Sequence, residues 1–188
     1  YYTDPIDGDF SPFDIVTIIN DYGKDWNNVK VFTQEFKFTS PASTSSPLKW
    51  TAGTYMFYQD NPVKQATRFG EDAGFYGIPD TNFSTINTTK GKSSGIAFFG
   101  QATYTIAHNF DLTAGLRYDY ERKEQSVLGE YQHDPDPNPI FETVPDTSAT
   151  ATYSALSPKV TAAYHLTDNN TIFASYSRGY RAGGMTQL

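Results

Sequence analysis

The sequence contains no cysteine and no uninterrupted apolar stretch close to the length of a membrane-spanning helix. Without cysteine it has no disulfide framework and no thiolate nucleophile or metal ligand. A helix that crosses a bilayer needs about 20 mostly apolar residues, so the missing stretch excludes a helical membrane protein. It does not exclude a membrane-spanning β-sheet, because strands of that kind alternate apolar and polar residues.

Basic residues are also scarce: 14 Lys and Arg stand against 21 Asp and Glu, which gives a net charge of −7. A nucleic-acid-binding protein needs a basic stripe that displaces counterions from phosphates, so nucleic acid is excluded as a partner. The first ten residues, YYTDPIDGDF, lack the basic and apolar regions of a secretory signal. If the protein is exported, we expect the chain to be processed or cut from a longer one.

Aromatic residues are abundant, with 14 Tyr and 14 Phe, and they favour the pleated surface of β-strands. The clearest strand is FDLTAGLRYDYE at residues 110–121, where every second residue from Phe110 to Tyr120 is apolar and the others are polar or glycine. Side chains alternate across a strand, so this segment has one apolar and one polar face. The apolar face has aromatic rings at both ends and aliphatic residues between them, as in a strand that crosses a bilayer.

The same alternation predicts six strands, after a first part at residues 1–29 that is predicted to be irregular. The predicted strands cover residues 30–40, 48–59, 94–106, 110–121, 154–166 and 171–181. Within the first part, residues 15–19 form a short apolar run that fits either a strand or a packing patch.

The predicted connections alternate in length. Short turns at 40–47, 107–109 and 167–170 alternate with long loops at 60–93 and 125–152, which show no sustained period. Outer-membrane barrels have this asymmetry, with short periplasmic turns and long extracellular loops. We therefore predict an all-β fold, an antiparallel meander of about six long strands that is a fragment of a transmembrane β-barrel over residues 30–184.

Aromatic residues also mark both ends of the predicted strands on one face, as membrane interfaces require. Those near the short turns are Trp50, Tyr104, Phe110 and Tyr164, and those near the long loops are Tyr58, Tyr118, Tyr120 and Tyr180. Arg178 shares this face near the outer interface, where a cation costs only about 0–1 kcal/mol. A soluble antiparallel binding module is the alternative, but its strands usually have about 5–6 residues, shorter than those predicted here.

Four segments together resemble the TonB-dependent outer-membrane receptors, a family of ferric-siderophore and related nutrient transporters. They are FTQEFKFTS at 32–40, LKWTAGTYMFYQ at 48–59, IAFFGQATYTIAHNFDLTAGLRYDYERK at 96–123 and LSPKVTAAYHLTDNNTIFASYSRGYRAGG at 156–184. The third and fourth carry the most specific similarity. The segments follow one another in the order of consecutive barrel strands.

The resemblance implies a bacterial outer-membrane protein with a plugged barrel of about 22 strands, of which six are present here. The plug domain and the TonB-box peptide have no counterpart in the sequence, so we expect a middle-to-late piece of the barrel. The implied partners are a ferric siderophore or similar nutrient, outer-membrane lipid, and the TonB complex acting through the missing plug. No cofactor and no catalysis by this chain are implied.

Motifs for catalysis or metal binding are weak. GKSS at 91–94 lacks the upstream glycine of a phosphate-binding loop, and GYRAGG at 179–184 is followed by no helix. Asp134, Asp136 and Asn138 offer alternating oxygen ligands, as in a calcium-binding loop. However, prolines separate these three residues, and the segment lacks the glycine and the bidentate glutamate that such a loop needs. A small outer-membrane hydrolase barrel remains an alternative function, although the strands present no Ser-His-acid set.

The predicted long loops carry exposed aromatic rings with an occasional cation. Residues 60–93 contribute Arg68, Phe69, Phe75, Tyr76 and Phe83, and residues 125–152 contribute Tyr131, His133 and Phe141. Rings and cations of this kind suit an aromatic or anionic chelate through stacking and cation–π contact. The candidate ligand-binding residues are Arg68, Phe69, Phe75, Tyr76, Tyr131 and His133. The alternative is that these side chains pack on one another.

The predicted inward face carries several charged residues. We expect Lys37, Arg117, Asp119 and Lys159 to form polar pairs with each other or with a plug. His165 lies on the same face, where we expect it to meet water or the plug.

Overall fold

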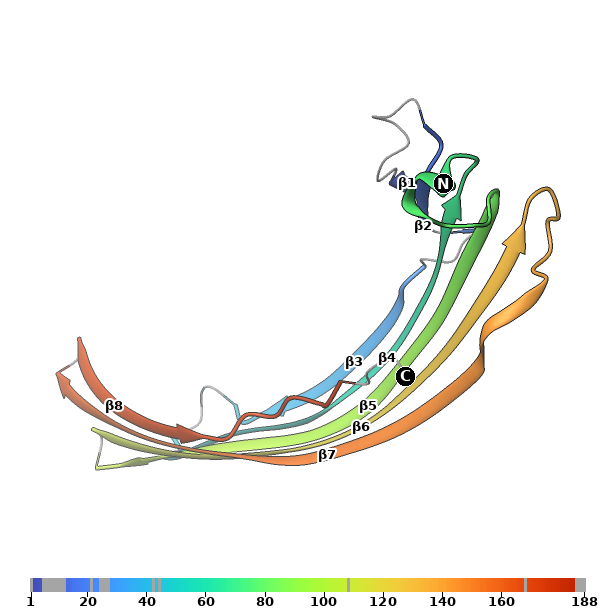
Figure 1. The fold of residues 1–188 in the computed structure, drawn as a ribbon. Coiled ribbons are helices and arrows are strands. Elements are labelled where there is room, and N and C mark those ends of the chain that lie inside the picture. Colours follow the sequence, from blue (N-terminus) through green and yellow to red (C-terminus); the bar gives the residue numbers. More distant parts are fainter. Residues whose placement is uncertain are drawn as a thin grey trace.

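The chain forms one antiparallel β-sheet that curls like part of a cylinder wall (Figure 1). The structure is a computed structural model, and it describes residues 2–4, 13–20, 22–23, 28–41, 43, 45–107, 109–167 and 169–184. Over these residues the strands are β1 (Tyr2–Asp4), β2 (Val16–Asn20), β3 (Lys30–Thr39), β4 (Leu48–Phe69), β5 (Phe83–Ile106), β6 (Phe110–His133), β7 (Phe141–Thr167) and β8 (Asn170–Ser177). A short 3-10 helix, η1 (Ala73–Tyr76), lies between β4 and β5.

The strands pair in the order β1-β2-β4-β5-β6-β7-β8, and β3 also pairs with β4. The six predicted strands correspond to β3–β8. We call the end of the sheet with the connections at 70–82 and 134–140 the outer end, and the end with the connections at 40–47, 107–109 and 168–169 the inner end.

The strands extend much farther toward the outer end than the sequence predicted. Most of the predicted loops at 60–93 and 125–152 is strand, because β4 and β5 stay paired from Asp60↔Lys92 to Phe69↔Phe83 without a register shift. The connections shrink to residues 70–82 and 134–140. Beyond the apolar band both faces of a hairpin are polar or half-buried, so the hydrophobic period disappears while the backbone ladder continues.

The predicted irregular region at 1–29 also contains strands. The apolar run at residues 15–19 falls largely in β2, which pairs with the outer end of β4 from Val16↔Phe69 to Asn20↔Gln65. β3 pairs with the inner part of the same edge of β4, beginning at Lys30↔Asp60. Both strands run antiparallel to β4, so β2 and β3 are two pieces of one interrupted strand.

Pro62 lies opposite this interruption. The carbonyls of Trp50 and Lys64 accept hydrogen bonds from Ser40 and Tyr22, so even-numbered residues of β4 point their backbone groups toward the β2/β3 edge. Pro62 shares this parity and sits between the stretches that pair with β2 and β3. A proline there removes no ladder hydrogen bond, which explains how it is tolerated inside a long strand.

The predicted last strand is shorter than expected, because β8 ends at Ser177 rather than at residue 181. Residues 178–184 then run inside the curve of the sheet (Figure 1), where the Lys123 ammonium donates to the Gly183 carbonyl at 3.1 Å. Tyr180 therefore does not belong to the outer aromatic row, as the sequence had suggested. The glycines of GYRAGG favour this departure, since glycine weakens a strand.

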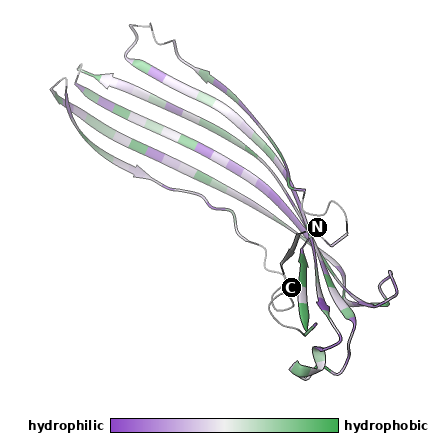
Figure 2. Cartoon of the chain, turned by 90° about the horizontal axis from the view of Figure 1, so that it is seen from above, coloured by the Kyte–Doolittle hydropathy of each residue, from purple (hydrophilic) through white to green (hydrophobic). Residues whose placement is uncertain are grey.

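The two faces of the sheet follow residue parity. The segment at 178–184 touches Tyr153 and Lys123, so odd-numbered side chains line the concave face. In the central part of the sheet, even-numbered residues lie on the convex face and are exposed, with Leu112, Leu116 and Val160 at 42%, 50% and 48%. Within the described residues, no second layer covers them, as a soluble sandwich would require. Figure 2 shows apolar and polar residues alternating along the strands.

The buried side chains gather mainly at the outer end. The buried apolar residues of the described chain are Ile15, Ala66, Ala73, Phe83, Ile86 and Ala97. Of these, Ala97 lies in the middle of the sheet. The outer end is therefore the part of this chain with its own packed interior.

Candidate functional site

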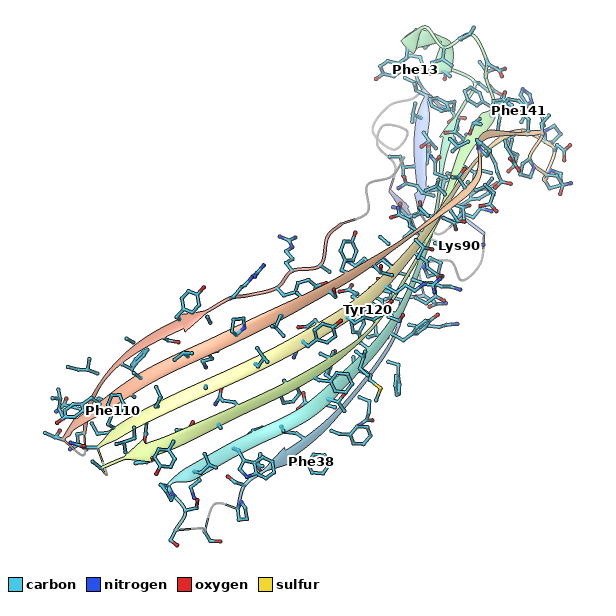
Figure 3. The ribbon with its side chains drawn as sticks, turned by 90° about the horizontal axis from the view of Figure 1, so that it is seen from below. Phe13, Phe38, Lys90, Phe110, Tyr120 and Phe141 are labelled. Carbon is cyan, nitrogen blue, oxygen red and sulfur yellow. The ribbon has the colours of Figure 1, made fainter. Side chains whose placement is uncertain are left out.

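A row of four stacked aromatic rings, among them Phe141, crosses the outer end of the sheet (Figure 3). The ring centroids are 4.7 Å apart for Phe69 and Phe83, 5.2 Å for Phe83 and Tyr131, and 4.8 Å for Tyr131 and Phe141. Their planes differ by only 10–22°. The strand register explains the row, because Phe69 pairs with Phe83 and Tyr131 with Phe141. We call these four residues the aromatic ladder; two of them, Phe69 and Tyr131, are predicted site residues.

Arg68 is the cation of the predicted site, and it is already paired. Its Nη1 lies 2.9 Å from Asp14 Oδ2 and its Nε lies 3.4 Å from Asp134 Oδ2. The hydrogen bond with Asp14, opposed by desolvation, raises the pKa of Arg68. The Asp14 carboxylate accepts hydrogen bonds from Arg68, and the backbone N–H of Asp14 donates to Asp72 Oδ2 at 2.9 Å. Arg68 and Asp14 together thus link the segment before β2 to both outer connections, Arg68 through Asp134 and Asp14 through Asp72.

Tyr131 and His133 meet at one carboxylate, that of Asp80. The Tyr131 hydroxyl donates to Asp80 Oδ2, and His133 Nε2 lies 3.7 Å from Asp80 Oδ1. The hydrogen bond from Tyr131 lowers the pKa of Asp80, and the same bond raises the pKa of Tyr131 to about 12. Sequence reasoning missed Asp14 and Asp80, because nothing in the local pattern links them to Arg68 and Tyr131, which are more than 50 residues away.

Phe75 and Tyr76 differ from the other predicted residues, since they project from η1 with 71% and 65% of their surface exposed. The ring of Phe13 packs against Phe75 at 5.0 Å with a tilt of 54°. Gly77 ends the helix in the left-handed region at φ +73°. The predicted residues thus divide into a packed group and two rings that are largely exposed.

The concave face carries polar pairs, as expected for the inside of a barrel. Arg117 Nη2 lies 2.8 Å from Asp119 Oδ1, which fulfils one of the expected pairings. His165 contacts protein: its two ring nitrogens lie 3.0 Å from Asp111 Oδ2 and 2.9 Å from Thr171 Oγ1. This hydrogen-bonded set joins β6, β7 and β8 at the inner end.

The concave face also contains rings that sequence reasoning missed, because it treated this face as polar. Tyr55 and Phe57 lie side by side on β4, with ring centroids 6.2 Å apart. The ring of Phe57 covers Gly95 on β5, and Phe99 on β5 covers Gly53 on β4 in the same manner. Part of the inner wall is therefore aromatic.

Metal ligation has little support among the described side chains, where no three His, Asp or Glu residues converge on one point. Asp136, considered above as a calcium ligand, accepts from the backbone N–H of Asn138 at 2.9 Å and so caps its own turn. His108 lies outside the described residues.

Taken together, a single antiparallel sheet with an apolar, ring-bordered convex face and a polar concave face is the wall of a membrane-spanning β-barrel. No helix in the described part of the chain is long and apolar enough to cross a membrane. The protein family described as TonB dependent receptor-like, beta-barrel matches residues 1–188, and the chain belongs to this family. The resemblance and the fold class predicted from sequence are thereby confirmed. Members of the family are outer-membrane transporters rather than enzymes.

The solved structures that match the chain include two receptors. The ferric yersiniabactin uptake receptor FyuA from Yersinia pestis aligns over 85% of this chain with 14% identity and a TM-score of 0.58. The ferric-catecholate import receptor Fiu from K12 E. coli aligns over 86% with 17% identity and a TM-score of 0.48. The chain covers 21% of the first protein and 28% of the second. Comparison with curated proteins finds no match.

Proposed function

We propose that the chain is part of the wall of a bacterial outer-membrane receptor that imports iron–siderophore complexes or similar nutrients. The observation that carries the proposal is the sheet itself, whose convex face is built for lipid and whose concave face is polar. Family membership and the likeness of its fold to FyuA support this assignment. Energy for uptake would come from the TonB complex acting through a plug domain.

The depth of the apolar band supports the placement in a membrane. Ten residues separate Phe110 from Tyr120 on β6, or about 33 Å along a strand. At the tilt of about 35–45° usual for outer-membrane barrels, this length spans about 25 Å, which is the height of their apolar band. The outer end then extends into the space outside the cell.

For the ligand, the exposed rings of Phe75 and Tyr76 are the strongest candidates. They can stack on an aromatic chelate without breaking an existing contact between strands. Phe69, Tyr131, His133 and Arg68 would act behind them, since their rings and charges are engaged with the aromatic ladder, Asp80, Asp14 and Asp134. We propose that these four residues hold the outer end in shape beneath the ligand.

The proposal is tested by uptake of radioactive iron presented as a panel of siderophores to cells whose only receptor is the full protein. We expect TonB-dependent uptake of at least one ferric chelate. Replacing Phe75 and Tyr76 by Ala removes about 1 kcal/mol of stacking, which should raise the half-saturating concentration about fivefold. Ile140→Ala, an exposed aliphatic change at the same end, is the control. Uptake of no chelate, or equal effects of both changes, would contradict the proposal.

A further inference from the structure

The concave face carries no formal charge over a stretch just inward of the aromatic ladder. This stretch consists of the odd-numbered residues within 61–67 on β4, 85–91 on β5, 125–129 on β6 and 147–149 on β7, which strand register places side by side. All of them are threonine, asparagine, glutamine, valine, glycine or alanine, and the charged residues within the same ranges are even-numbered. We call this set of odd-numbered residues the neutral belt.

A pocket of about 280 Å³ opens in the neutral belt. Its lining includes Val63, Gln65, Asn87, Thr89 and Val127, which all belong to the belt. Val144 lines it as well, because a register shift between β6 and β7 brings this residue opposite Gly129. The pocket therefore offers amide and hydroxyl groups for hydrogen bonds beside the apolar surface of three valines. No charged side chain is among the described residues that line it.

The cations next to the belt along β4 and β6 already have carboxylate partners. Arg68, which follows the belt on β4, is held by Asp14 and Asp134. Lys123, which precedes it on β6, lies 3.4 Å from Glu121 Oε1. An anionic ligand pressed against this wall would lose water without gaining an opposite charge, which is costly. An uncharged ligand with hydrogen-bonding groups would not meet that cost.

We propose that the neutral belt binds an uncharged ferric chelate of the tris-hydroxamate class. Three hydroxamates lose one proton each and so cancel the charge of Fe³⁺, whereas three catecholates lose two protons each and leave a strongly anionic complex. Hydroxamate oxygens accept hydrogen bonds from Asn87 and Thr89, and the methylene chains of the arms pack on Val63, Val127 and Val144. The inference rests on the proposed function, because it names the class of chelate that the receptor imports.

The test is equilibrium binding of radioactive iron chelates to the purified full receptor. The probes are ferrichrome, a neutral tris-hydroxamate, and ferric enterobactin, a tris-catecholate. We expect ferrichrome to bind at least tenfold more tightly. Asn87→Ala/Thr89→Val removes two hydrogen-bonding groups from the pocket and should weaken ferrichrome binding at least tenfold. The control Ser126→Ala/Ser148→Ala removes two paired hydroxyl side chains at the same height on the opposite face and should keep wild-type affinity.

A second variant reverses the charge preference of the pocket. Asn87→Lys places an ammonium group there, so the ratio of ferrichrome affinity to ferric enterobactin affinity should fall at least tenfold. Ser126→Lys adds the same charge to the opposite face and should leave this ratio unchanged. Both affinities come from one preparation of each variant, so the ratio does not depend on the fraction of protein that folds.

Four results would overturn the inference: equal or tighter binding of ferric enterobactin by the wild type, binding of neither probe, equal losses in Asn87→Ala/Thr89→Val and its control, or an unchanged ratio in Asn87→Lys. Uptake of radioactive iron is measured on the same wild-type receptor. If any chelate is taken up, each of these results removes the neutral-ligand inference and leaves the transport proposal standing. Uptake of no chelate removes the transport proposal, and the inference with it.

Discussion

Two glycines show how single residues shape the inner wall. On neighbouring strands, Gly53 faces Phe99 and Phe57 faces Gly95, and each ring lies over the glycine opposite it. A ring that covers a glycine shields backbone that would otherwise meet water in the middle of a sheet. The space taken by each ring is space that a Cβ would need. Glycine is required here for close approach rather than for an unusual backbone angle.

Gly95→Ala should therefore destabilise the full receptor by about 1–3 kcal/mol, as overpacking usually does. The added Cβ would lie 2.5 Å from Phe57 Cε1 and 2.9 Å from the Tyr120 carbonyl oxygen, and the second of these is backbone. Gly100→Ala on the same strand is the control, since its nearest neighbour would be 3.8 Å away. The measurement is the urea midpoint for loss of heat-modifiable gel mobility. Equal midpoints for the two variants would show that the ring moves aside freely.

The bond between Tyr131 and Asp80 predicts an unusual titration. The pKa of Tyr131 is raised to about 12, so the bond contributes fully below the ordinary tyrosine pKa of about 10 and is lost as pH rises through about 12. Asp80 has a lowered pKa, so the same bond is also lost when acid protonates that carboxylate. The difference in tyrosinate absorbance between the wild type and Tyr131→Phe should show one late-titrating phenol. Asp80→Asn should return it toward pH 10, and a wild-type midpoint near 10 would refute the bond.

At the scale of elements, the sequence predicted the strands well only where lipid imposes a pattern. Residues 110–121 alternate without error because one face meets hydrocarbon and the other does not. The same strand continues to His133 with no such contrast, so its outer half was predicted as loop. The candidate site was also predicted only in part. The sequence identified the aromatic rings and the cation, but Asp14 and Asp80 reach them only because distant segments of the chain pair in the sheet.

The interrupted strand gives a prediction about proline. Odd-numbered residues of β4 point their backbone groups toward β5, so Val63→Pro removes a ladder N–H opposite Thr89. Leaving its acceptor unpaired should cost about 1–3 kcal/mol. Pro62→Val, one position away, adds an N–H that faces the interruption and should change stability little. Hydrogen exchange of the β5 amides in the full receptor measures the effect of both substitutions. Faster exchange in Pro62→Val alone would mean that the even-numbered residues of β4, and not the odd-numbered ones, point their backbone groups toward β5.

The whole molecule is a curved wall with a lipid side and a water side, and this asymmetry is testable at one pair of neighbours. The chain has no cysteine, so single cysteines label it cleanly. A spin label at Ala114→Cys on the convex face should be relaxed more by oxygen, which concentrates in lipid, than by a water-soluble nickel complex. Thr113→Cys, its concave neighbour, should not show that preference. The same oxygen preference at both positions in the full receptor would contradict the two-sided wall.

The gap between β2 and β3 is a suitable place to insert a tag into this protein. Asn20 and Lys30 are ten residues apart in the sequence, whereas their partners on β4, Gln65 and Asp60, are only five residues apart. A barrel strand normally does not tolerate an insertion, because one added residue would turn every following side chain to the opposite face of the sheet. Here the ladder restarts on its own beyond the break, so an epitope tag inserted into this gap should leave the pairing of β3 with β4 unchanged, and with the outer end outside the cell, as proposed, antibody should reach the tag on intact cells.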